Sequence, residues 1–501
     1  MTYWRAALLM WWIGGCAWVR PVELRPKLSA PATYVSAYRS VEEKPRSAGA
    51  EEGEAPAQES KPGARPAVVV PDGGPWWTAF ADSALDDAVQ EAIRNNYLIR
   101  DLRTLIYENQ LIPEMPNGIL WPLQIEVPAT LARTTDPVAP SSGGRGSVAN
   151  NTAADVGISA SYQLDVFGHL DIKRRTFEDL IEQQTQNTER LAQSLALQVT
   201  QLWFEILEQR AQLQLLERQV KYNQELLALV RARFEQHLTT RLVVLQQEQQ
   251  LLDTQARVPL LHAQLALLDS RLNNVLGRAP NSRKALVPHE RELPDLPPSP
   301  SIGRPAELLD KSPDLRFAQS RVAEVQHLMS ENLTSWLPTI DVFGGFGVRT
   351  FNFSQPFMLA AAGVRLTWPI FDGAQRITLA KQLDLTLERR TGQYRSAFNE
   401  AIQRVQDALL QEQKQTAHVI TLRSEVELGE RVLSEARELF ERGVSDYLPV
   451  LAALSNLSNL ERASLQARRQ LLSYRTQLYF ALGGTWSKAA TVRDPRGENH
   501  E

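Results

Sequence analysis

The sequence of 501 residues has almost no cysteine, since Cys16 is the only one. A disulfide within the chain is therefore excluded. Aromatic residues are also scarce at 7%, which is low for a compact enzyme of this size and ordinary for long helices. The formal net charge is −4 and the pI about 6.1. A role in nucleic-acid binding therefore has no electrostatic support.

Residue types that often carry catalysis or bind metals do not form recognisable motifs. The seven histidines show no paired spacing such as H-x-x-x-H, and no glycine-rich phosphate loop follows a candidate strand. The five methionines are scattered, so no soft-ligand path for a metal ion is indicated. The sequence therefore predicts no enzyme, no metal site and no cofactor.

Long apolar runs are missing as well. After residue 20 no run of about eighteen apolar residues occurs, so no membrane-spanning helix is predicted. If the chain crosses a membrane, it must then do so as a β-barrel. The apolar run at 6–13 follows Arg5 and is too short to span a bilayer, which is the pattern of a secretory signal.

The single cysteine has an explanation in its neighbours. Gly14 and Gly15 stand directly before Cys16, which resembles the lipobox of bacterial lipoproteins. We therefore predict that a signal peptide at 1–15 is removed and that the Cys16 thiol is lipidated. Ala17, rather than aspartate, resembles sorting to the outer membrane. The alternative is an ordinary signal peptide with an incidental cysteine.

Two segments have the composition of disordered chain. Residues 16–75 are rich in Pro, Ala, Glu and Ser and cannot bury a core, so we expect a lipidated tether. We expect residues 488–501 to form a disordered tail. The folded part is therefore expected between these two segments.

An internal repeat organises the folded part. The segment "RFEQHLTTRLVVL" at 233–245 aligns with "LFERGVSDYLPVL" at 439–451, an offset of 206 residues. The offset predicts two halves, 76–290 and 291–487, each with a helix, two strands and a long helical hairpin.

Four strands of about ten residues are predicted, at 123–131, 156–166, 339–349 and 362–370, with a loop at about 135–155. Each alternates apolar and polar residues, which fits a membrane barrel with lipid outside and water inside. The alternative is a soluble sandwich, in which two apolar faces cover each other. Four strands cannot close a barrel, because the smallest need about eight. Several copies of the chain would have to contribute strands.

The predicted helices are too long for an ordinary globular domain. We expect helices at 82–111 and 304–335 before the strands, and hairpins at 171–276 and 373–483 after them. Their apolar residues recur at helical spacing among Gln, Glu, Arg and Thr, which suits helices packed side by side around an aqueous space. A cytosolic coiled coil is the alternative, against which the signal sequence and the alternating strands count.

The order of these features resembles a known family. The lipobox and tether are followed by "WWTAFADSALDDAVQEAIRNNYLIR", "SYQLDVFGHLDIKRR", "LTWPIFDGAQR" and "LYFALGGTW". Together they resemble the TolC-like outer-membrane efflux factors, and within them the OprM/NodT lipoprotein branch. The resemblance extends over about residues 76–487.

This resemblance implies a mainly α fold with a membrane β part. Three copies would form a homotrimer whose strands make one twelve-stranded barrel in the outer membrane of a Gram-negative bacterium. Their helical hairpins would form an α-barrel in the periplasm. The implied function is a passive exit duct for small molecules, docked to a periplasmic adaptor and an inner-membrane pump of the resistance-nodulation-division type. Two alternatives are a duct for type I protein secretion and a non-conducting lipoprotein that spaces the membranes.

Glycines and acids mark the places where strands lead into helices. We expect Gly168 and Gly373 to provide the unusual backbone that this change of direction needs. Asp165 and Asp372 are expected to cap or orient the same junctions.

The resemblance also assigns a role to the two hairpin turns, which would contact the adaptor at the periplasmic end. The residues concerned are His237, Leu238, Thr239, Gly443, Val444 and Ser445. We expect a left-handed Gly443, a cap on the returning helix from Ser445 or Asp446, and Pro449 in its first turn. The alternative is a mere reversal of the helix without partner contact.

Relatives often carry an acid one residue after the Val450-Leu451 pair, where it forms a ring at the constriction. This chain has Ala452 there. Asp446 is the remaining candidate acid of a periplasmic gate, and Leu448 and Leu451 are the apolar candidates. The transported substrate cannot be predicted from the sequence.

Overall fold

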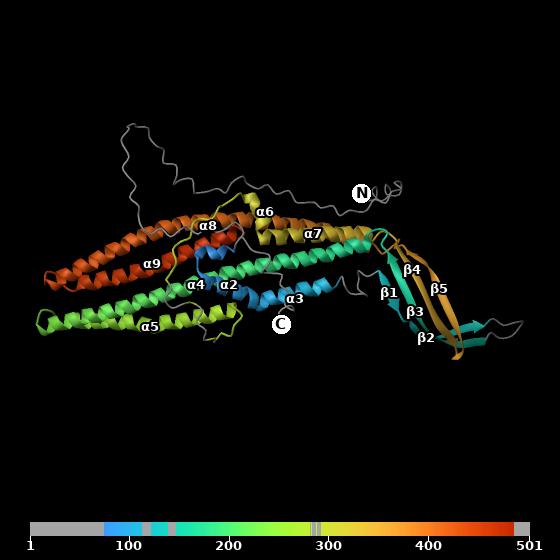
Figure 1. Cartoon of the computed structure of the whole chain (residues 1–501), viewed down its shortest axis with the longest axis horizontal. Helices are drawn as coiled ribbons and strands as arrows, with labels where there is room; N and C mark the ends of the chain where they lie inside the picture. The colour runs from blue at the N-terminus through green and yellow to red at the C-terminus, as the bar shows by residue number, and fades with distance from the viewer. Residues whose placement is uncertain are drawn as a thin grey trace, which may run out of the picture. The chain divides into compact units, whose positions relative to one another are not determined.

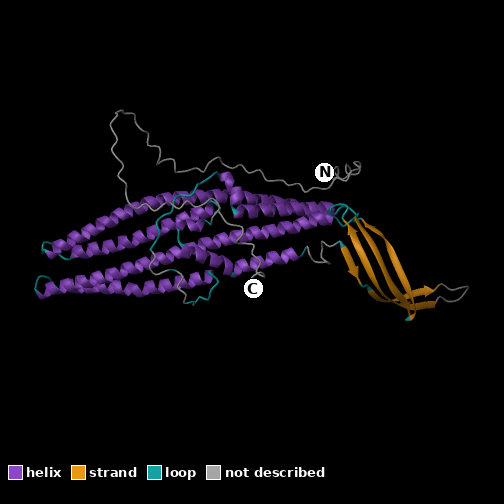
Figure 2. Ribbon diagram, viewed as in Figure 1, coloured by secondary structure: helices purple, strands orange, loops and turns teal. Residues whose placement is uncertain are grey.

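The computed structural model describes residues 75–112, 122–138, 147–280, 282, 287 and 292–484. The predicted signal peptide, Cys16, the tether and the tail lie outside these ranges. The described residues form long helices and one antiparallel sheet (Figure 2). They belong to two compact units. Unit 1 contains Thr104–Thr185 and Phe317–Arg395, and unit 2 contains Gln186–Arg316 together with the described residues before Thr104 and after Arg395.

The two long hairpins are confirmed. Helix α4 (His169–Glu235) is followed by α5 (Arg241–Val275), and α8 (Gln375–Glu441) by α9 (Leu448–Ala481). Helices α4 and α8 have 67 residues each, which corresponds to about 100 Å of helix. Figure 1 shows α5 running back along α4, and α9 along α8. Within the described ranges, no helix is both long and apolar enough to span a membrane.

The predicted helix at 82–111 is wrong at one position. The structure has α2 (Ser83–Asn95) and α3 (Tyr97–Leu111), preceded by the short 3₁₀ helix η2 (Trp76–Phe80). Asn96 separates α2 from α3 with an extended backbone. Its side chain accepts a hydrogen bond from Leu98 N (3.0 Å) and donates one to Val275 O (3.2 Å). This capping interaction restarts the helix.

The predicted helix at 304–335 is also divided. The 3₁₀ helix η3 (Pro305–Glu307) and α6 (Leu308–Lys311) precede α7 (Pro313–Thr334). Ser312 is extended, with φ −80° and ψ 118°. The ring of the following proline disfavours helical geometry at this residue, which accounts for the break.

The sheet has the strand order β1-β3-β4-β5, and β2 also pairs with β3. The strands are β1 (Leu123–Glu126), β2 (Ala129–Val138), β3 (Ser147–Leu164), β4 (Thr339–Phe351) and β5 (Ser354–Thr367). The first predicted strand is therefore two segments. Pro128 lies between them and has no N–H to donate, although its carbonyl accepts from Gly157 N (3.1 Å).

The strands extend further than predicted, so the loop expected at 135–155 is wrong. Strand β2 reaches Val138 and β3 begins at Ser147, because the backbones of these polar segments pair with each other. Similarly, β4 and β5 are joined by the two residues Asn352 and Phe353, both with positive φ (50° and 58°). Such a turn matches the twist of paired strands.

The register confirms the predicted alternation. Ile158 lies opposite Phe346, and Val342 lies between Tyr162 and Val364 on its two neighbouring strands. These residues form one apolar face that stays exposed, with Val364 at 68% and Phe346 at 58%. The opposite face carries mainly polar and small residues, together with Phe343, Phe357 and Leu359, and it includes an ion pair between Asp155 and Arg349. A soluble sandwich would bury the apolar face, and the described chain does not.

An extensive apolar core lies in unit 2. It contains Trp203 and Phe204 of α4, against which η2 and α2 pack. Asp82 caps α2 by accepting from Ala84 N (3.0 Å) and Leu85 N (3.2 Å), and it also accepts from Trp203 Nε1 (3.1 Å). One carboxylate therefore fixes the start of α2 and its position on α4.

Candidate functional site at the hairpin turns

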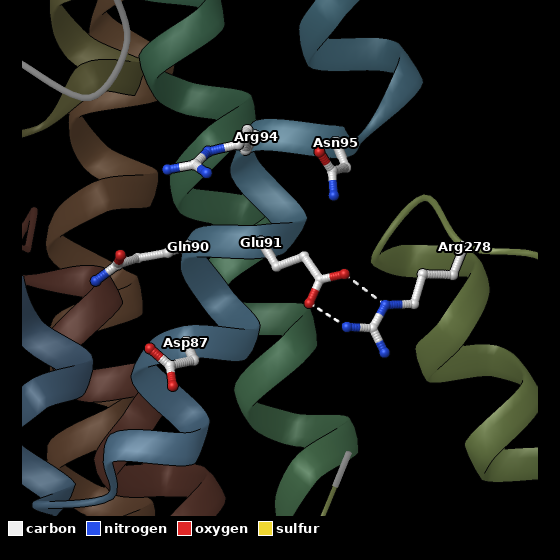
Figure 3. Close-up of a pocket in the computed structure, with 6 residues that line it drawn as sticks. All are labelled: Asp87, Gln90, Glu91, Arg94, Asn95 and Arg278. Atoms are coloured by element: carbon white, nitrogen blue, oxygen red, sulfur yellow. Dashed lines mark hydrogen bonds and ion pairs between the residues drawn. The ribbon is translucent and has the colours of Figure 1, made fainter. Parts of the chain in front are cut away.

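The described residues contain no group of three or more His, Cys, Asp or Glu side chains able to hold a metal ion. A shallow polar pocket of about 410 Å³ lies beside α2 (Figure 3) and is lined by Asp87, Gln90, Glu91, Arg94, Asn95 and Arg278. Both carboxylate oxygens of Glu91 contact the Arg278 guanidinium. This pairing is typical of a structural ion pair rather than of an acid or base held ready for catalysis.

The first hairpin turn joins α4 to α5. His237 has a left-handed backbone, with φ +59°. Its N–H donates to Phe234 O (2.9 Å), and Leu238 N donates to Arg233 O (2.9 Å). These two bonds satisfy carbonyl groups at the end of α4, as in a Schellman motif.

The second hairpin turn joins α8 to α9 with the same pattern, 206 residues later. Gly443 has φ +76°, as expected from the sequence. Its N–H donates to Phe440 O (3.0 Å), and Val444 N donates to Leu439 O (3.0 Å). The two turns therefore follow the same backbone path, although one uses histidine and the other glycine.

The expected cap from Ser445 or Asp446 is wrong. Tyr447 is the residue at the start of α9, and no side chain caps this helix. The Ser445 hydroxyl instead points to Asp446 O (3.4 Å). The Tyr447 carbonyl accepts from Val450 N (3.0 Å), and its buried ring packs edge-on against Phe440. Packing of an aromatic residue thus fixes the start of α9, and Pro449 lies in its first turn as predicted.

Both turns present apolar side chains to the outside. Leu238 of the first turn is 61% exposed, and Val444, its counterpart in the repeat, is 73% exposed. His237 and Gly443 are exposed as well, whereas Thr239 and Ser445 are half-buried. The turns therefore offer a mixed apolar and polar surface.

The three candidate gate residues do not point the same way. Asp446 and Leu448 are exposed, and so is Ala452. Leu451 is half-buried and packs on an apolar cluster formed by α4, α8 and α9. Of the two apolar candidates, Leu448 is therefore the exposed one.

Arg233 links the two turns. Its Nη1 donates to Glu441 O (2.8 Å), and its guanidinium lies 4.7 Å from the centre of the Phe440 ring. Both turns lie at the same end of the hairpins in unit 2 (Figure 1). The candidate site is therefore one joint surface with residues from both halves of the sequence.

Buried residues lie behind this surface, chiefly Tyr447 and Gln247, and the sequence pattern does not predict their burial. A glutamine within a Gln-rich helix is expected to face water, and Gln247 is instead completely buried. The repeat contained a signal, because the counterpart of Gln247 at the same offset is Ala453, an apolar residue that is also buried. No such signal exists for Tyr447, whose counterpart is the exposed Arg241.

The two strand-to-helix junctions lie in unit 1. Gly168 and Gly373 both have positive φ (72° and 66°). Asp165 accepts from Leu170 N (3.0 Å) and Asp171 N (3.1 Å), and so caps α4. These contacts stabilise the change from strand to helix in the first half.

In the second half Asp372 accepts from both the backbone N (3.1 Å) and the Nε (2.6 Å) of Arg376. The hydrogen bond from the Arg376 side chain lowers the pKa of the Asp372 carboxyl. Arg376 also donates to Ser335 O (2.9 Å), and its guanidinium lies 4.8 Å from the Trp336 ring. A buried arginine therefore holds the second junction against the end of α7.

Comparison with known proteins agrees with this fold. Residues 125–278 and 305–484 match the family described as "Outer membrane efflux protein". The pyoverdine export outer membrane protein OpmQ of Pseudomonas putida is 27% identical over 456 residues, which cover 87% of this chain and 93% of that protein. Nodulation protein T of Rhizobium leguminosarum is 22% identical, over 83% of this chain and 88% of its own length.

Solved structures share the fold at low identity. The outer-membrane channel OprN superposes with a TM-score of 0.74 and 20% identity, over 92% of this chain and 99% of that one. The Campylobacter jejuni CmeC outer membrane channel gives a TM-score of 0.71 and 15% identity, with coverages of 88% and 95%. The described hairpins and sheet therefore have an architecture already seen in such channels.

Proposed function

The chain belongs to the outer membrane efflux protein family and acts as an exit duct in the outer membrane, and we propose that three copies assemble to form that duct. One observation supports the proposal above all: a sheet with one exposed apolar face continues into helical hairpins far longer than a single globular core requires. A sheet in this form is incomplete, since its apolar face and its edges lack partners within the described chain.

We propose that the apolar face of β1–β5 contacts lipid and that the polar face lines water. The edge strand β5 of one copy would pair with the opposite edge, β1 and β2, of the next copy, because an open edge leaves backbone groups unsatisfied in a bilayer. Strands β1 and β2 pair with successive stretches of β3 and so occupy one strand position. Each copy then supplies four positions, and three copies would supply the twelve strands of a closed barrel. The Asp155–Arg349 ion pair would then lie on the wet side, where its charges are tolerated.

The helical hairpins would form the periplasmic part of the duct. Their turns at 236–240 and 442–447 would dock to a periplasmic adaptor, with Leu238 and Val444 as the apolar contacts. Asp446 and Leu448 would line the constriction. The duct performs no reaction in this proposal, and an inner-membrane pump of the resistance-nodulation-division type would supply the energy.

Small molecules are the proposed cargo. The relatives include proteins named for export of pyoverdine and for efflux of toluene, which favours small organic compounds over secreted proteins. Lipidation of Cys16 would anchor each copy in the outer membrane, as predicted from Gly14-Gly15-Cys16. Labelling with radioactive palmitate checks this point, since Cys16→Ser should abolish the label.

Efflux in cells and conductance in planar bilayers test the proposed function. A strain that lacks its own outer-membrane duct should regain dye export when it produces this chain together with its adaptor and pump. Purified protein should form trimers and show an ion conductance that changes when Leu448→Ala or Asp446→Ala is introduced at the constriction. A protein that merely spaces two membranes would show no conductance with either of these variants.

A further inference from the structure

The polar face of the sheet bears an apolar patch near the β4–β5 turn. It consists of Phe351 on β4 and of Phe357 and Leu359 on β5, and we call it the aromatic patch. The two phenylalanine rings lie 5.8 Å apart at an interplanar angle of 31°. The three side chains are 45%, 40% and 41% exposed, respectively. Large apolar side chains therefore meet solvent on the face that we assign to the lumen.

The register places this patch on the same face as the Asp155–Arg349 ion pair. Phe357 lies directly opposite Arg349. Phe351 lies opposite Ala153, which is two residues from Asp155 on β3, and side chains two residues apart in a strand share a face. The charges of the ion pair offset each other beside the rings, with Arg349 Nη2 3.3 Å from Asp155 Oδ2. The patch therefore offers apolar ring surface and little net charge.

Phe343 lies further along the same face and shows how a ring is covered there. The Arg365 guanidinium lies 5.0 Å from the centre of the Phe343 ring. A Cβ atom at Gly363 would lie 3.1 Å from Phe343 Cζ, so the ring packs against the backbone of β5. Leu359, by contrast, lies opposite Gly347, which has no side chain to cover it. The neighbouring strands thus cover Phe343 and leave the aromatic patch exposed.

Assembly into the proposed barrel would leave the patch uncovered as well. Side chains just fill the interior of a barrel of about eight strands, and the diameter grows roughly linearly with strand number. In a barrel of twelve strands, the patches of the three copies would lie too far apart across the lumen to cover one another. A polar, water-filled interior does not account for adjacent exposed apolar side chains. Such side chains are typical of a binding site.

We propose that the aromatic patch binds planar rings of aromatic cargo on their way through the lumen. The inference rests on the proposed function, since it takes the polar face to line a duct for small organic compounds. A flat ring can stack on Phe351 and Phe357 in the offset or tilted geometry that aromatic pairs prefer, and lie against Leu359. A saturated ring of similar size buries similar apolar area but has no π face. The patch therefore favours aromatic over saturated rings.

Protection of a thiol within the patch tests the proposal in intact cells. Leu359→Cys leaves both rings in place, and its reaction with the small aliphatic reagent 2-sulfonatoethyl methanethiosulfonate is followed in the full-length chain. The competitors are benzenesulfonate and cyclohexanesulfonate, which carry the same charge and differ in the saturation of the ring. We expect benzenesulfonate to halve the rate at about one fifth of the concentration that cyclohexanesulfonate needs. The chain without the added thiol measures any reaction of Cys16.

Removal of the rings is the second half of the experiment. Phe351→Leu combined with Phe357→Leu keeps the apolar bulk and removes the π faces, so the two competitors should then act at concentrations within about twofold of each other. Phe353→Leu, the matched change in the β4–β5 turn, should keep the preference for benzenesulfonate. Equal protection by the two compounds while both rings are present would overturn the proposal, and so would a preference that survives the loss of both rings. Protection by neither compound would overturn it as well.

Failure of the proposed function looks different. Met358 precedes Leu359 on β5 and lies on the apolar face, opposite Val348. If that face contacts lipid, Leu359→Cys should react roughly tenfold faster than Met358→Cys, because the bilayer excludes a charged reagent. Equal rates at the two positions, or no reaction at either, would contradict the barrel itself, whatever the competitors do.

Discussion

The two halves of the chain reverse direction along the same backbone path and hold it with different side chains. His237 and Gly443 take equivalent left-handed positions and make equivalent hydrogen bonds. A residue with a Cβ atom adopts this conformation at a cost of about 1 kcal/mol or more, which glycine avoids. The first turn is therefore the strained one. The repeat preserves the geometry of the turn and not the residues that make it.

The anchoring of the two returning helices differs as well. The buried Tyr447 directly precedes α9, whereas its counterpart in the repeat is Arg241, the exposed first residue of α5. The first turn gains its support indirectly, through Arg233 and through Gln247, which bind parts of the second hairpin. The second turn therefore acts as the fixed point of the pair.

The largest effect expected from this asymmetry comes from Tyr447→Ala. Truncation of a buried aromatic residue should lower the free energy of local opening at the start of α9 by about 3 kcal/mol. Arg241→Ala is the matched change in the first half. It should alter the free energy of local opening at the start of α5 by less than about 0.5 kcal/mol, as is usual at exposed positions. Amide exchange over 448–454 and 241–247 measures both. Equal losses in the two variants would contradict the difference in anchoring.

The second comparison replaces the left-handed residue of each turn. His237→Gly should stabilise the first turn by about 1 kcal/mol, and Gly443→Ala should destabilise the second by a similar amount. A Cβ atom at Gly443 would meet only Arg233 Nη2 at 3.8 Å, so the cost is conformational rather than steric. Exchange rates at the two turns, or their rates of cleavage by a protease, report the two changes.

Gly392 supplies a control for these two substitutions. It lies within α8 and has open space around its Cβ position. Gly392→Ala should therefore stabilise the helix by about 0.5–1 kcal/mol, opposite in sign to Gly443→Ala. If both glycine variants changed stability in the same direction, the left-handed backbone would not be the cause.

The sequence predicts what depends on neighbours along the chain and fails where distant residues decide. The 3.6-residue period predicted α4, α5, α8 and α9, and glycine marked the turn at 443. By contrast, the break at Asn96 depends on Val275 O, which is 179 residues away. The cap expected from Ser445 fails because Tyr447 is held by a glutamine 200 residues away. The polar ends of β2 and β3 form strands through backbone pairing, which side-chain patterns do not reveal.

A smaller effect is expected from Arg233, the link between the two turns. Arg233→Met keeps the aliphatic stem but loses the hydrogen bond to Glu441 O and the contact with the Phe440 ring. We expect the free energy of local opening to fall by about 1 kcal/mol at both turns, measured by amide exchange. Arg442→Met is the matched control, because Arg442, directly after α8, forms an exposed ion pair with Glu438 of that helix, and such surface pairs contribute little. If the control lowered the free energy of opening by the same amount, the cause would be positive charge near the turns and not the link through Arg233.

The smallest effect concerns pH at the strand-to-helix junctions, where the two halves also differ. In the first half His169 contacts Thr334 Oγ1 (3.2 Å) at the start of α4. Burial, followed by the charge of Lys173, lowers the pKa of His169 below its ordinary value of 6.5. The unfolded chain then binds more protons than the folded chain near and below pH 6.5, so stability at this junction falls as the pH falls through that range.

In the second half Arg376 lowers the pKa of Asp372 below its ordinary value of 3.8. The stability that the ionised Asp372 contributes is fully present well above pH 3.8, and it is lost only as the pH falls through the lowered pKa. Amide exchange at the starts of α4 and α8 between pH 7 and pH 5, corrected for the intrinsic pH dependence, should therefore show weaker protection at the first junction alone. His169→Gln should remove this change, since glutamine does not titrate. Weakening of both junctions over the same range would instead point to a process that the two halves share.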